Sequence, residues 1–238
     1  MRTDKFLAGK IAVVTGGGRG IGRTVAVRLA GLGAEVVLAG TTRSRLDAAL
    51  AEIRAAGGRA RGVAADVSDE ASVMNLFAEA GAVDVLVNNA GIGRFAPVAE
   101  TTLEDWERVM AVNLRGAFLC SREAMRRMAG RGGRIVNIAS VVGLKGYVNQ
   151  GAYTASKHGL MGLSKVMAAE GQKDNIITQV IAPGGVDTDM VGDARPDLDR
   201  SVLIHAEDIA DAVEYLLGQD GNAVTDLIQV RRRGNAPW

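Results

Sequence analysis

The chain of 238 residues carries 28 Lys and Arg against 27 Asp and Glu, so its formal net charge at pH 7 is only +1. This balance gives no basic field that would attract nucleic acid or an anionic membrane surface. The single cysteine, Cys120, excludes an internal disulfide and any Cys-based metal spacing, and we expect no metal site. No signal-peptide core and no apolar stretch of membrane-spanning length is found, which predicts a cytoplasmic protein.

Short apolar runs alternate with longer amphipathic segments along the chain. The apolar runs predict strands at Ile11 to Thr15, Glu35 to Ala39, Arg59 to Ala64, Val83 to Asn88, Arg134 to Ile138, Ile176 to Ala182 and Leu227 to Val230. Because most of these runs are continuous rather than alternating, both faces of the sheet are expected to be covered, as in a parallel sheet. The amphipathic segments predict helices at Ile21 to Leu32, Ser44 to Ala56, Ser68 to Ala80, Leu103 to Met128, Ala152 to Ala169 and Glu207 to Leu217. We therefore predict an α/β fold: a Rossmann-type doubly wound parallel sheet of about seven strands with helices on both faces, in a single domain.

The first predicted strand runs into a glycine-rich loop, Thr15 to Gly22, and then into a helix. Glycines permit a tight turn and close approach of a ligand to the backbone, and a helix amino terminus favours a diphosphate. In a βαβ unit this loop predicts a dinucleotide site. Its glycines Gly16, Gly20 and Gly22 are separated by three residues and then by one, unlike the common GxGxxG pattern.

Tyr153 and Lys157 lie four residues apart in a predicted helix, and Ser140 lies thirteen residues before Tyr153. Residues four apart share one helix face. A fixed cation beside a phenol lowers its pKa, by about one to three units for a close pair. The tyrosine would then exchange a proton with an alcohol or carbonyl oxygen more readily. The alternative interpretation is a solvated helix face with a half-buried tyrosine.

Several motifs occur in a fixed order: TGxxxGIG, Asp66-Val67, Asn88-Asn89-Ala90-Gly91, Asn113, Ser140, Tyr153 with Lys157, and Pro183-Gly184. This set resembles the short-chain dehydrogenase/reductase family, and in particular its branch of 3-oxoacyl-carrier-protein reductases. The resemblance extends from Lys10 to Leu217.

The resemblance implies four catalytic residues: Asn113, Ser140, Tyr153 and Lys157. Tyr153 would act as acid/base on the substrate oxygen, and Ser140 would hold that oxygen. Lys157 would lower the pKa of Tyr153 and bind the nicotinamide ribose. Asn113 would interrupt the hydrogen bonding of its helix and anchor a water molecule that relays protons, whereas the residue alone indicates a packing asparagine.

The choice of nicotinamide cofactor is expected to depend on the end of the second strand. An NAD site normally places a carboxylate there, but that position falls at Gly40 and no carboxylate follows until Asp47. Thr41, Thr42, Arg43 and Arg19 could instead receive a 2′-phosphate, which predicts NADP(H) over NAD(H). Alternatively, Arg43 opens a solvated helix and both cofactors are accepted. The complete predicted cofactor set is Gly16, Gly18, Arg19, Gly20, Ile21, Thr41, Thr42, Arg43, Asp66, Val67, Asn89, Ala90, Gly91, Tyr153, Lys157, Pro183, Gly184, Val186 and Thr188.

The substrate segment after Thr188, at about residues 189–206, looks shortened compared with carrier-protein reductases and predicts an open or shallow pocket. The candidate substrate residues are Arg94, Phe95, Val141, Val142, Tyr147, Gln150, Gly185 and Val191. Arg94 would pair with an acidic substrate group or simply lie on the surface. Against a carrier-protein substrate, Asp174-Asn175 stands where those reductases tend to keep a basic residue, although Arg131 could serve.

The carboxyl-terminal sequence VTDLIQVRRRGNAPW also departs from the usual family ending, which commonly packs at a subunit interface. A homotetramer or dimer is still expected, and the run Arg231 to Arg233 is most simply a solvated segment. The sequence thus predicts an NADPH-dependent reductase of a ketone or 3-oxoacyl group, with Tyr153 as acid/base. The alternatives are an NAD-dependent alcohol dehydrogenase of the same family and a non-catalytic NADP-binding redox sensor.

Overall fold

The computed structural model describes residues 5–194 and 199–235. The predicted substrate segment at 189–206 is therefore described in part, because residues 195–198 lie outside the described residues. Within the described part the segment contains a short helix, α7 (Asp189–Ala194), and a 3-10 turn, Arg200–Val202.

The structure is built on one sheet of seven strands in the order β3-β2-β1-β4-β5-β6-β7, and every neighbouring pair is parallel. The strands are β1 (Ile11–Thr15), β2 (Glu35–Gly40), β3 (Arg59–Ala64), β4 (Val85–Asn88), β5 (Gly133–Ile138), β6 (Ile176–Pro183) and β7 (Leu227–Val230). The order reverses between β1 and β4, and ligands of open α/β sheets bind at such a switch point, beyond the carboxyl ends of the strands. The predicted fold class is confirmed.

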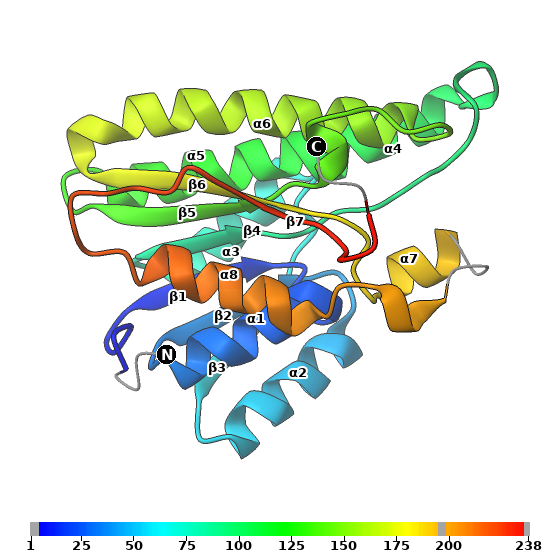
Figure 1. The fold of residues 1–238 in the computed structure, drawn as a ribbon. Coiled ribbons are helices and arrows are strands. Elements are labelled where there is room, and N and C mark those ends of the chain that lie inside the picture. Colours follow the sequence, from blue (N-terminus) through cyan, green and yellow to red (C-terminus); the bar gives the residue numbers. More distant parts are fainter. Residues whose placement is uncertain (1–4, 195–198, 236–238) are drawn as a thin grey trace.

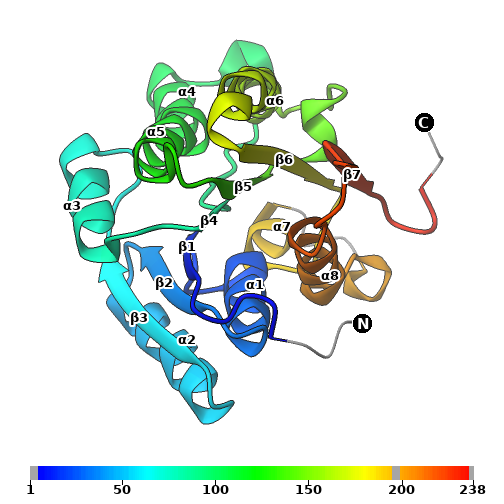
Figure 2. The ribbon, with the colours of Figure 1, turned by 90° about the vertical axis from the view of Figure 1, so that its left-hand side faces the viewer.

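Helices cover both faces of the sheet, which is seen nearly end-on in Figure 2. One face carries α1 (Gly20–Gly31), α2 (Arg43–Ala55) and α8 (Ala206–Leu217), and the other carries α3 (Glu70–Ala80), α5 (Gly116–Met128) and α6 (Gly151–Gly171). The carboxyl ends of the strands and α7 lie on the same side of the molecule (Figure 1). No described helix is both long and apolar enough to cross a bilayer.

The sheet separates two apolar layers. Ala12 and Val14 of β1 pack with α1, α2 and α8, whereas Val13 packs on the opposite side with α3 and α5. Successive strand residues point to opposite faces, so a continuous apolar run is what two covered faces require. The apolar runs read from the sequence therefore correspond to a sheet buried on both sides.

The long helix predicted at Leu103 to Met128 is interrupted. It consists of α4 (Leu103–Met110), a π-helical turn at Ala111–Arg115, and α5. The turn contains Asn113, whose side chain is 1% exposed. π-turns inside helices occur frequently at functional sites, so this interruption lies where the sequence motif placed one.

Candidate active site

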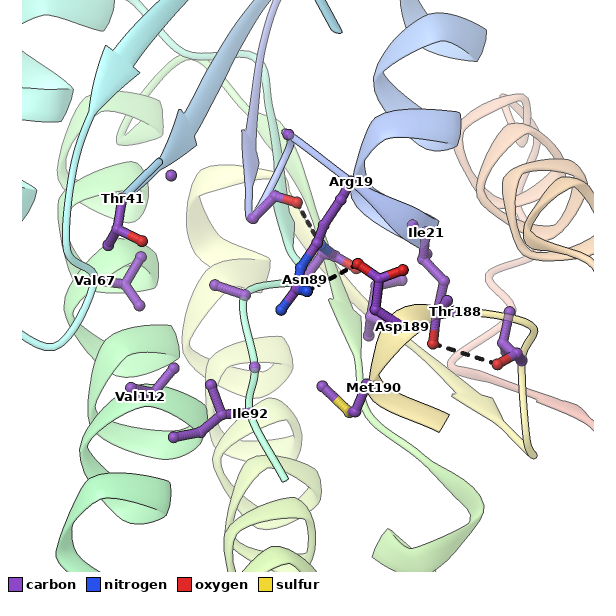
Figure 3. A pocket seen from close by; sticks show the side chains of 18 of the residues that line it. Arg19, Ile21, Thr41, Val67, Asn89, Ile92, Val112, Thr188, Asp189 and Met190 are labelled. Atoms are coloured by element: carbon purple, nitrogen blue, oxygen red, sulfur yellow. Dashed lines mark hydrogen bonds and ion pairs between the residues drawn. The ribbon is translucent and has the colours of Figure 1, made fainter. Parts of the chain in front are cut away.

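A cleft of about 300 Å³ lies at the carboxyl edge of the sheet, where the loops after β1 to β6 converge. Figure 3 shows Thr41, Val67 and Val112 at one end of the cleft and Thr188 and Met190 at the other. Of the predicted cofactor and catalytic residues, those that line it are Gly16, Gly18, Arg19, Gly20, Ile21, Thr41, Thr42, Asp66, Val67, Asn89, Ala90, Gly91, Ser140, Tyr153, Lys157, Pro183, Gly184, Val186 and Thr188. The cleft is long enough to bring together residues from six strand ends.

The glycine-rich loop is packed too tightly for side chains. A Cβ atom on Gly22 would lie 2.4 Å from Asn89 Nδ2 and 2.4 Å from the carbonyl oxygen of Gly16, and Gly16 has a φ of +65°. Asn89 Nδ2 donates a hydrogen bond to the Thr15 carbonyl at 2.9 Å, and Thr15 Oγ1 accepts from the backbone N–H of Asn89 at 3.0 Å. These bonds join the β1 and β4 loops beside the amino terminus of α1.

At the end of β2, the two nearby arginines differ in position. Arg43, a predicted cofactor residue, does not line the cleft, and its Nε donates to Asp47 Oδ1 at 3.0 Å. Arg45 lines the cleft in its place, together with Thr41 and Thr42. The Arg45 Cβ lies 3.1 Å from the position that a Cβ on Gly18 would occupy, so the stem of Arg45 packs against the glycine-rich loop.

Asp66 lines the cleft at the end of β3. Its Oδ1 accepts hydrogen bonds from the Ser68 backbone N–H at 2.9 Å and from the Ser68 hydroxyl at 2.6 Å. Burial favours the neutral acid, but the hydrogen bonds from Ser68 and the charges of Arg108 and Arg115 outweigh it and hold the pKa of Asp66 below its ordinary value. The carboxylate is therefore ionised and available as an acceptor. Arg108 also lines the cleft, with Nη2 at 3.9 Å from Asp66 Oδ2.

Tyr153, Lys157 and Ser140 come together on one wall of the cleft. Lys157 Nζ donates to the Ile138 carbonyl at 2.9 Å and lies 5.7 Å from the centroid of the Tyr153 ring. Ser140 Oγ donates to the Pro183 carbonyl at 3.3 Å and also forms a side-chain hydrogen bond with Tyr153. The phenol of α6 and the serine after β5 therefore lie beside each other on this wall.

The pKa values in this wall are controlled by burial. Burial raises the pKa of Tyr153 to about 12, against the opposing effect of the Ser140 hydrogen bond. Burial also lowers the pKa of Lys157 to about 8. The direction for Tyr153 is opposite to the one expected from the sequence, because the ammonium is directed to the Ile138 carbonyl and desolvation outweighs its field at the phenol. Without a bound cofactor Tyr153 is a protonated phenol at neutral pH.

Asn113 connects the π-turn to two other parts of the site. Its Oδ1 accepts from the Ile92 backbone N–H at 2.8 Å, and its Nδ2 donates to the Ile92 carbonyl at 2.9 Å and to Ser156 Oγ at 3.1 Å. Ser156, which is fully buried, donates to the Tyr153 carbonyl at 2.8 Å. The amide of Asn113 thus connects the loop after β4 to the helical turn of α6 that carries Tyr153.

Ser156 is a residue that the sequence prediction missed. Its signal was the position directly before Lys157, on the buried face of the helix. Residues that line the cleft and were not predicted include Arg45, Arg108, Asp189 and Met190. Asp189 Oδ2 accepts from Arg19 Nη1 at 3.0 Å, and this pair spans the cleft from the glycine-rich loop to α7 (Figure 3).

Of the predicted substrate residues, only Val191 lines the cleft. Phe95 meets the Tyr153 ring edge-on at 5.8 Å between centroids. Arg94 is exposed and pairs with Asp105 at 3.3 Å, so its charge is balanced within the chain. Val142 is buried, Gln150 bridges to Ala96, and Val141, Tyr147 and Gly185 are not fully buried. No cluster of metal-ligating side chains is found in the described part of the chain.

Comparisons with known proteins identify a family and relatives of similar sequence and fold. The family model described as short chain dehydrogenase matches residues 10–199. The 3-oxoacyl-[acyl-carrier-protein] reductase FabG of Aquifex aeolicus is 43% identical over 190 residues, 77% of this chain and 77% of that protein. The 3beta-hydroxysteroid dehydrogenase of Mediterraneibacter gnavus is 38% identical over 225 residues, 92% of this chain and 82% of that protein. Among solved structures, a short-chain type dehydrogenase/reductase from Mycobacterium marinum is 28% identical, with a TM-score of 0.87 over 97% of this chain and 96% of that one.

Proposed function

The chain belongs to the short-chain dehydrogenase/reductase family, and on that premise we propose that it reduces a ketone to a secondary alcohol with NADPH. Membership makes it an oxidoreductase that acts on a CH–OH group or a carbonyl with NAD(P). The observation that carries the proposal is the convergence of Tyr153, Ser140 and Lys157 on one wall of a cleft whose floor is the glycine-rich loop.

The cleft has residues suited to two parts of a dinucleotide, the diphosphate and the adenine. The glycine-rich loop leads into the amino terminus of α1, and the free backbone N–H groups of a helix amino terminus suit a diphosphate. Asp66, held ionised by Ser68, suits the adenine amino group. The bound cofactor supplies the hydride. The residues of this chain orient the substrate oxygen and supply the proton.

In the reductive direction Tyr153 is the proton donor. With a pKa of about 12 the phenol is protonated at neutral pH, as an ordinary tyrosine also is, and the hydroxyl donates to the substrate oxygen while negative charge develops there. Ser140 holds the same oxygen, and the positive charge of Lys157 stabilises the phenolate after the proton has left. Because the pKa of Lys157 is about 8, this charge is lost in moderately alkaline solution, and turnover in the reductive direction is expected to fall there.

Asn113 and Ser156 act as positioning residues in this proposal. The π-turn frees backbone groups of the helix from their usual partners, and a water molecule held there would relay protons to Lys157. Ser156 connects Asn113 to the carbonyl of Tyr153 through two hydrogen bonds.

The preference for NADPH is supported by the end of β2. Gly40, Thr41 and Thr42 line the cleft and offer no carboxylate, while Arg45 offers a guanidinium beside them. An arginine fork binds phosphate through charge-assisted hydrogen bonds. A 2′-phosphate would meet attraction here and no repulsion, and the second candidate, an NAD-dependent alcohol dehydrogenase, would lack the usual carboxylate partner.

The test is oxidation of NADPH and NADH by the purified protein with diacetyl, an aromatic ketone, acetoacetyl-CoA and a keto sugar. NADPH-dependent turnover that Tyr153→Phe abolishes, with cofactor affinity retained, supports the proposal. Turnover that survives this substitution refutes the assignment of the proton donor. Cofactor binding without turnover of any ketone favours the redox sensor.

We also propose a homo-oligomer. Trp106 of α4, Phe118 of α5 and Val166 of α6 are 38, 42 and 52% exposed, so the outer helices carry apolar side chains that a second copy would cover. Light scattering coupled to size exclusion tests this, and a strictly monomeric mass would refute it. A cytoplasmic location stays a prediction, which fractionation of the expressing cells tests.

A further inference from the structure

The arginine run Arg231 to Arg233 begins directly beyond β7, at the edge of the sheet that holds the cleft. Val230 is the register partner of Pro183, and the Gly184 backbone N–H donates to the Val230 carbonyl at 2.7 Å. The Pro183 carbonyl in turn accepts from Ser140 Oγ at 3.3 Å. The run therefore starts directly after the residue of β7 that pairs with Pro183, whose carbonyl accepts the Ser140 hydrogen bond.

The backbone of the run stays close to the Pro183-Gly184 segment. A Cβ atom on Gly184 would lie 3.5 Å from the Val230 carbonyl oxygen and 3.7 Å from the Arg232 nitrogen. Gly184 lines the cleft. The backbone of Arg232 therefore lies beside Gly184, a residue of the cleft wall, although Arg232 itself does not line the cleft.

The three side chains are used differently. Arg231 Nη1 donates to the carbonyls of Arg232, Arg233 and Asn235 at 3.3, 3.3 and 2.7 Å, so it holds the turn after β7. Arg233 is exposed and Arg232 is partly exposed. Within residues 5–194 and 199–235 no carboxylate lies within ion-pair distance of Arg232 or Arg233. Two positive charges are thus left uncompensated by the described chain.

Two carboxylates of the segment after β6 are already paired with arginines. Asp187 accepts from Arg200 Nε at 2.6 Å, and Asp189 accepts from Arg19 Nη1 at 3.0 Å, so each already has a cationic partner. Lys145, which follows the turn after Ser140, is exposed and forms no ion pair with a described carboxylate. Arg232, Arg233 and Lys145 are thus three cationic side chains that form no ion pair with a described carboxylate, in a chain whose formal net charge is only +1.

Resting on the reductase function proposed above, we propose that Arg232 and Arg233 bind an anionic group of the ketone substrate, a carboxylate or a phosphate. An arginine guanidinium binds either anion through two parallel N–H donors. The ketone oxygen would lie at Tyr153 and Ser140, and the anion would lie toward β7. Uncompensated charge at the rim also raises the rate at which an anionic substrate reaches the cleft.

The experiment compares ketones that differ in charge and little else. Acetoacetate is paired with ethyl acetoacetate, and dihydroxyacetone phosphate with dihydroxyacetone, so that the two pairs separate carboxylate from phosphate recognition. kcat/KM for NADPH oxidation is measured with the wild-type protein and with the double variant Arg232→Gln, Arg233→Gln. Arg231 is left unchanged because it holds the turn.

A matched control removes two charges elsewhere. Arg54 of α2 and Arg59 of β3 are exposed and form no ion pair with a described residue. β3 is the edge strand at the opposite end of the sheet from β7. The double variant Arg54→Gln, Arg59→Gln thus has the same net charge change as the test variant. Circular dichroism and turnover of the neutral ketones verify that both variants fold.

We expect the anionic member of at least one pair to be preferred by the wild-type protein. The test variant should lose about threefold to tenfold of that preference, mainly through KM, whereas the control should keep it. Raising the ionic strength from about 0.05 to about 0.5 M should weaken the preference of the wild-type protein and have little effect on the test variant.

Other results would overturn the inference and can be told apart. Equal turnover within both pairs, or a preference that survives in the test variant, refutes anion recognition by these arginines and leaves the reductase function standing. A changed oligomeric mass in the test variant with an unchanged preference assigns the arginines to an interface between copies instead. No oxidation of NADPH or NADH with any member of either pair refutes the reductase function together with the inference.

Discussion

Replacing Arg45 by alanine should weaken the binding of NADPH and leave the binding of NADH nearly unchanged. Arg45 lines the cleft beside Thr41 and Thr42, and its stem packs against Gly18 of the glycine-rich loop. The two cofactors differ by the 2′-phosphate, so a side chain that binds only that group contributes only to NADPH affinity.

The magnitude follows from the exposure of the side chain. A hydrogen bond to a charged group contributes about 1.5–3 kcal/mol. Arg45 is exposed, so solvent screens the contact and the lower end of that range applies. A loss of about 1.5 kcal/mol corresponds to roughly a tenfold increase in the Kd for NADPH.

Isothermal titration calorimetry of both cofactors measures this difference directly. Arg43→Ala is the matched control, because Arg43 lies two residues away and pairs with Asp47 outside the cleft. We expect Arg43→Ala to change either Kd by less than about twofold, since an exposed i,i+4 pair contributes only about 0.3–0.5 kcal/mol to stability.

Two results would refute the reasoning. Equal weakening of NADPH and NADH by Arg45→Ala would show that the side chain supports the loop and does not read the phosphate. A larger effect of Arg43→Ala than of Arg45→Ala would restore the assignment made from the sequence.

Three further predictions concern Lys157, Ser156 and Gly22. The lowered pKa of Lys157 means that the folded protein binds fewer protons than the unfolded chain between about pH 8 and 10.5, so the free energy of unfolding should rise with pH in that window. In urea denaturation, the free energy of unfolding of the wild type relative to that of Lys157→Met should increase by on the order of 1 kcal/mol between about pH 7.5 and 9.5. A difference between the two free energies that stays constant over this range would contradict the prediction. Ser156→Ala should lower kcat about tenfold, because the helical turn that carries Tyr153 loses a hydrogen bond. The control Ser164→Ala breaks a comparable bond to an asparagine of β5, and it should lower stability while kcat stays within about twofold of wild type. Equal kcat values for the two variants would show that Ser156 has only a packing role. Gly22→Ala should abolish cofactor binding in a fluorescence titration, because its Cβ would lie 2.4 Å from two atoms. The control Gly31→Ala should retain cofactor binding, because nothing lies within 4 Å of its Cβ position. Cofactor binding by Gly22→Ala would show that the loop can shift.

The parallel sheet and the location of the site were predictable because they follow from short-range patterns. Continuous apolar runs indicated strands covered on both faces, and the glycine-rich loop after β1 indicated the phosphate-binding turn. Because all strands are parallel, their carboxyl ends meet at one edge, and motifs that are distant in sequence become neighbours there. Asn89, Ser140 and Pro183 are brought together in this way.

The π-turn could not be derived from its own residues. The apolar periodicity continues through Leu103 to Met128, and the interruption depends on hydrogen bonds between Asn113 and the backbone of Ile92, twenty-one residues earlier. Only the motif match singled out Asn113. A contact across the fold, and no local signal, determines the helix geometry there.

Arg45, and not the predicted Arg43, lines the cleft because of where each residue lies around the axis of α2. The helix α2 begins at Arg43, and two residues along a helix correspond to a rotation of about 200°. The two arginines therefore project to opposite sides, and the one that reaches the cleft depends on the residue at which the helix starts. Sequence patterns place such a start only within a few residues.

The pairing of β1 with β4 has a consequence for folding. Register partners in this pair are about seventy residues apart, for example Val13 with Leu86, so the pair closes a long loop that includes two complete strand–helix units. The cleft forms at this junction, where the β1 and β4 loops are joined through Thr15 and Asn89. A chain in which β1 and β4 are not yet paired has no complete nucleotide site. Nucleotide binding is thus restricted to the native state, which it stabilises by mass action, and the thermal midpoint of the protein should rise with cofactor concentration.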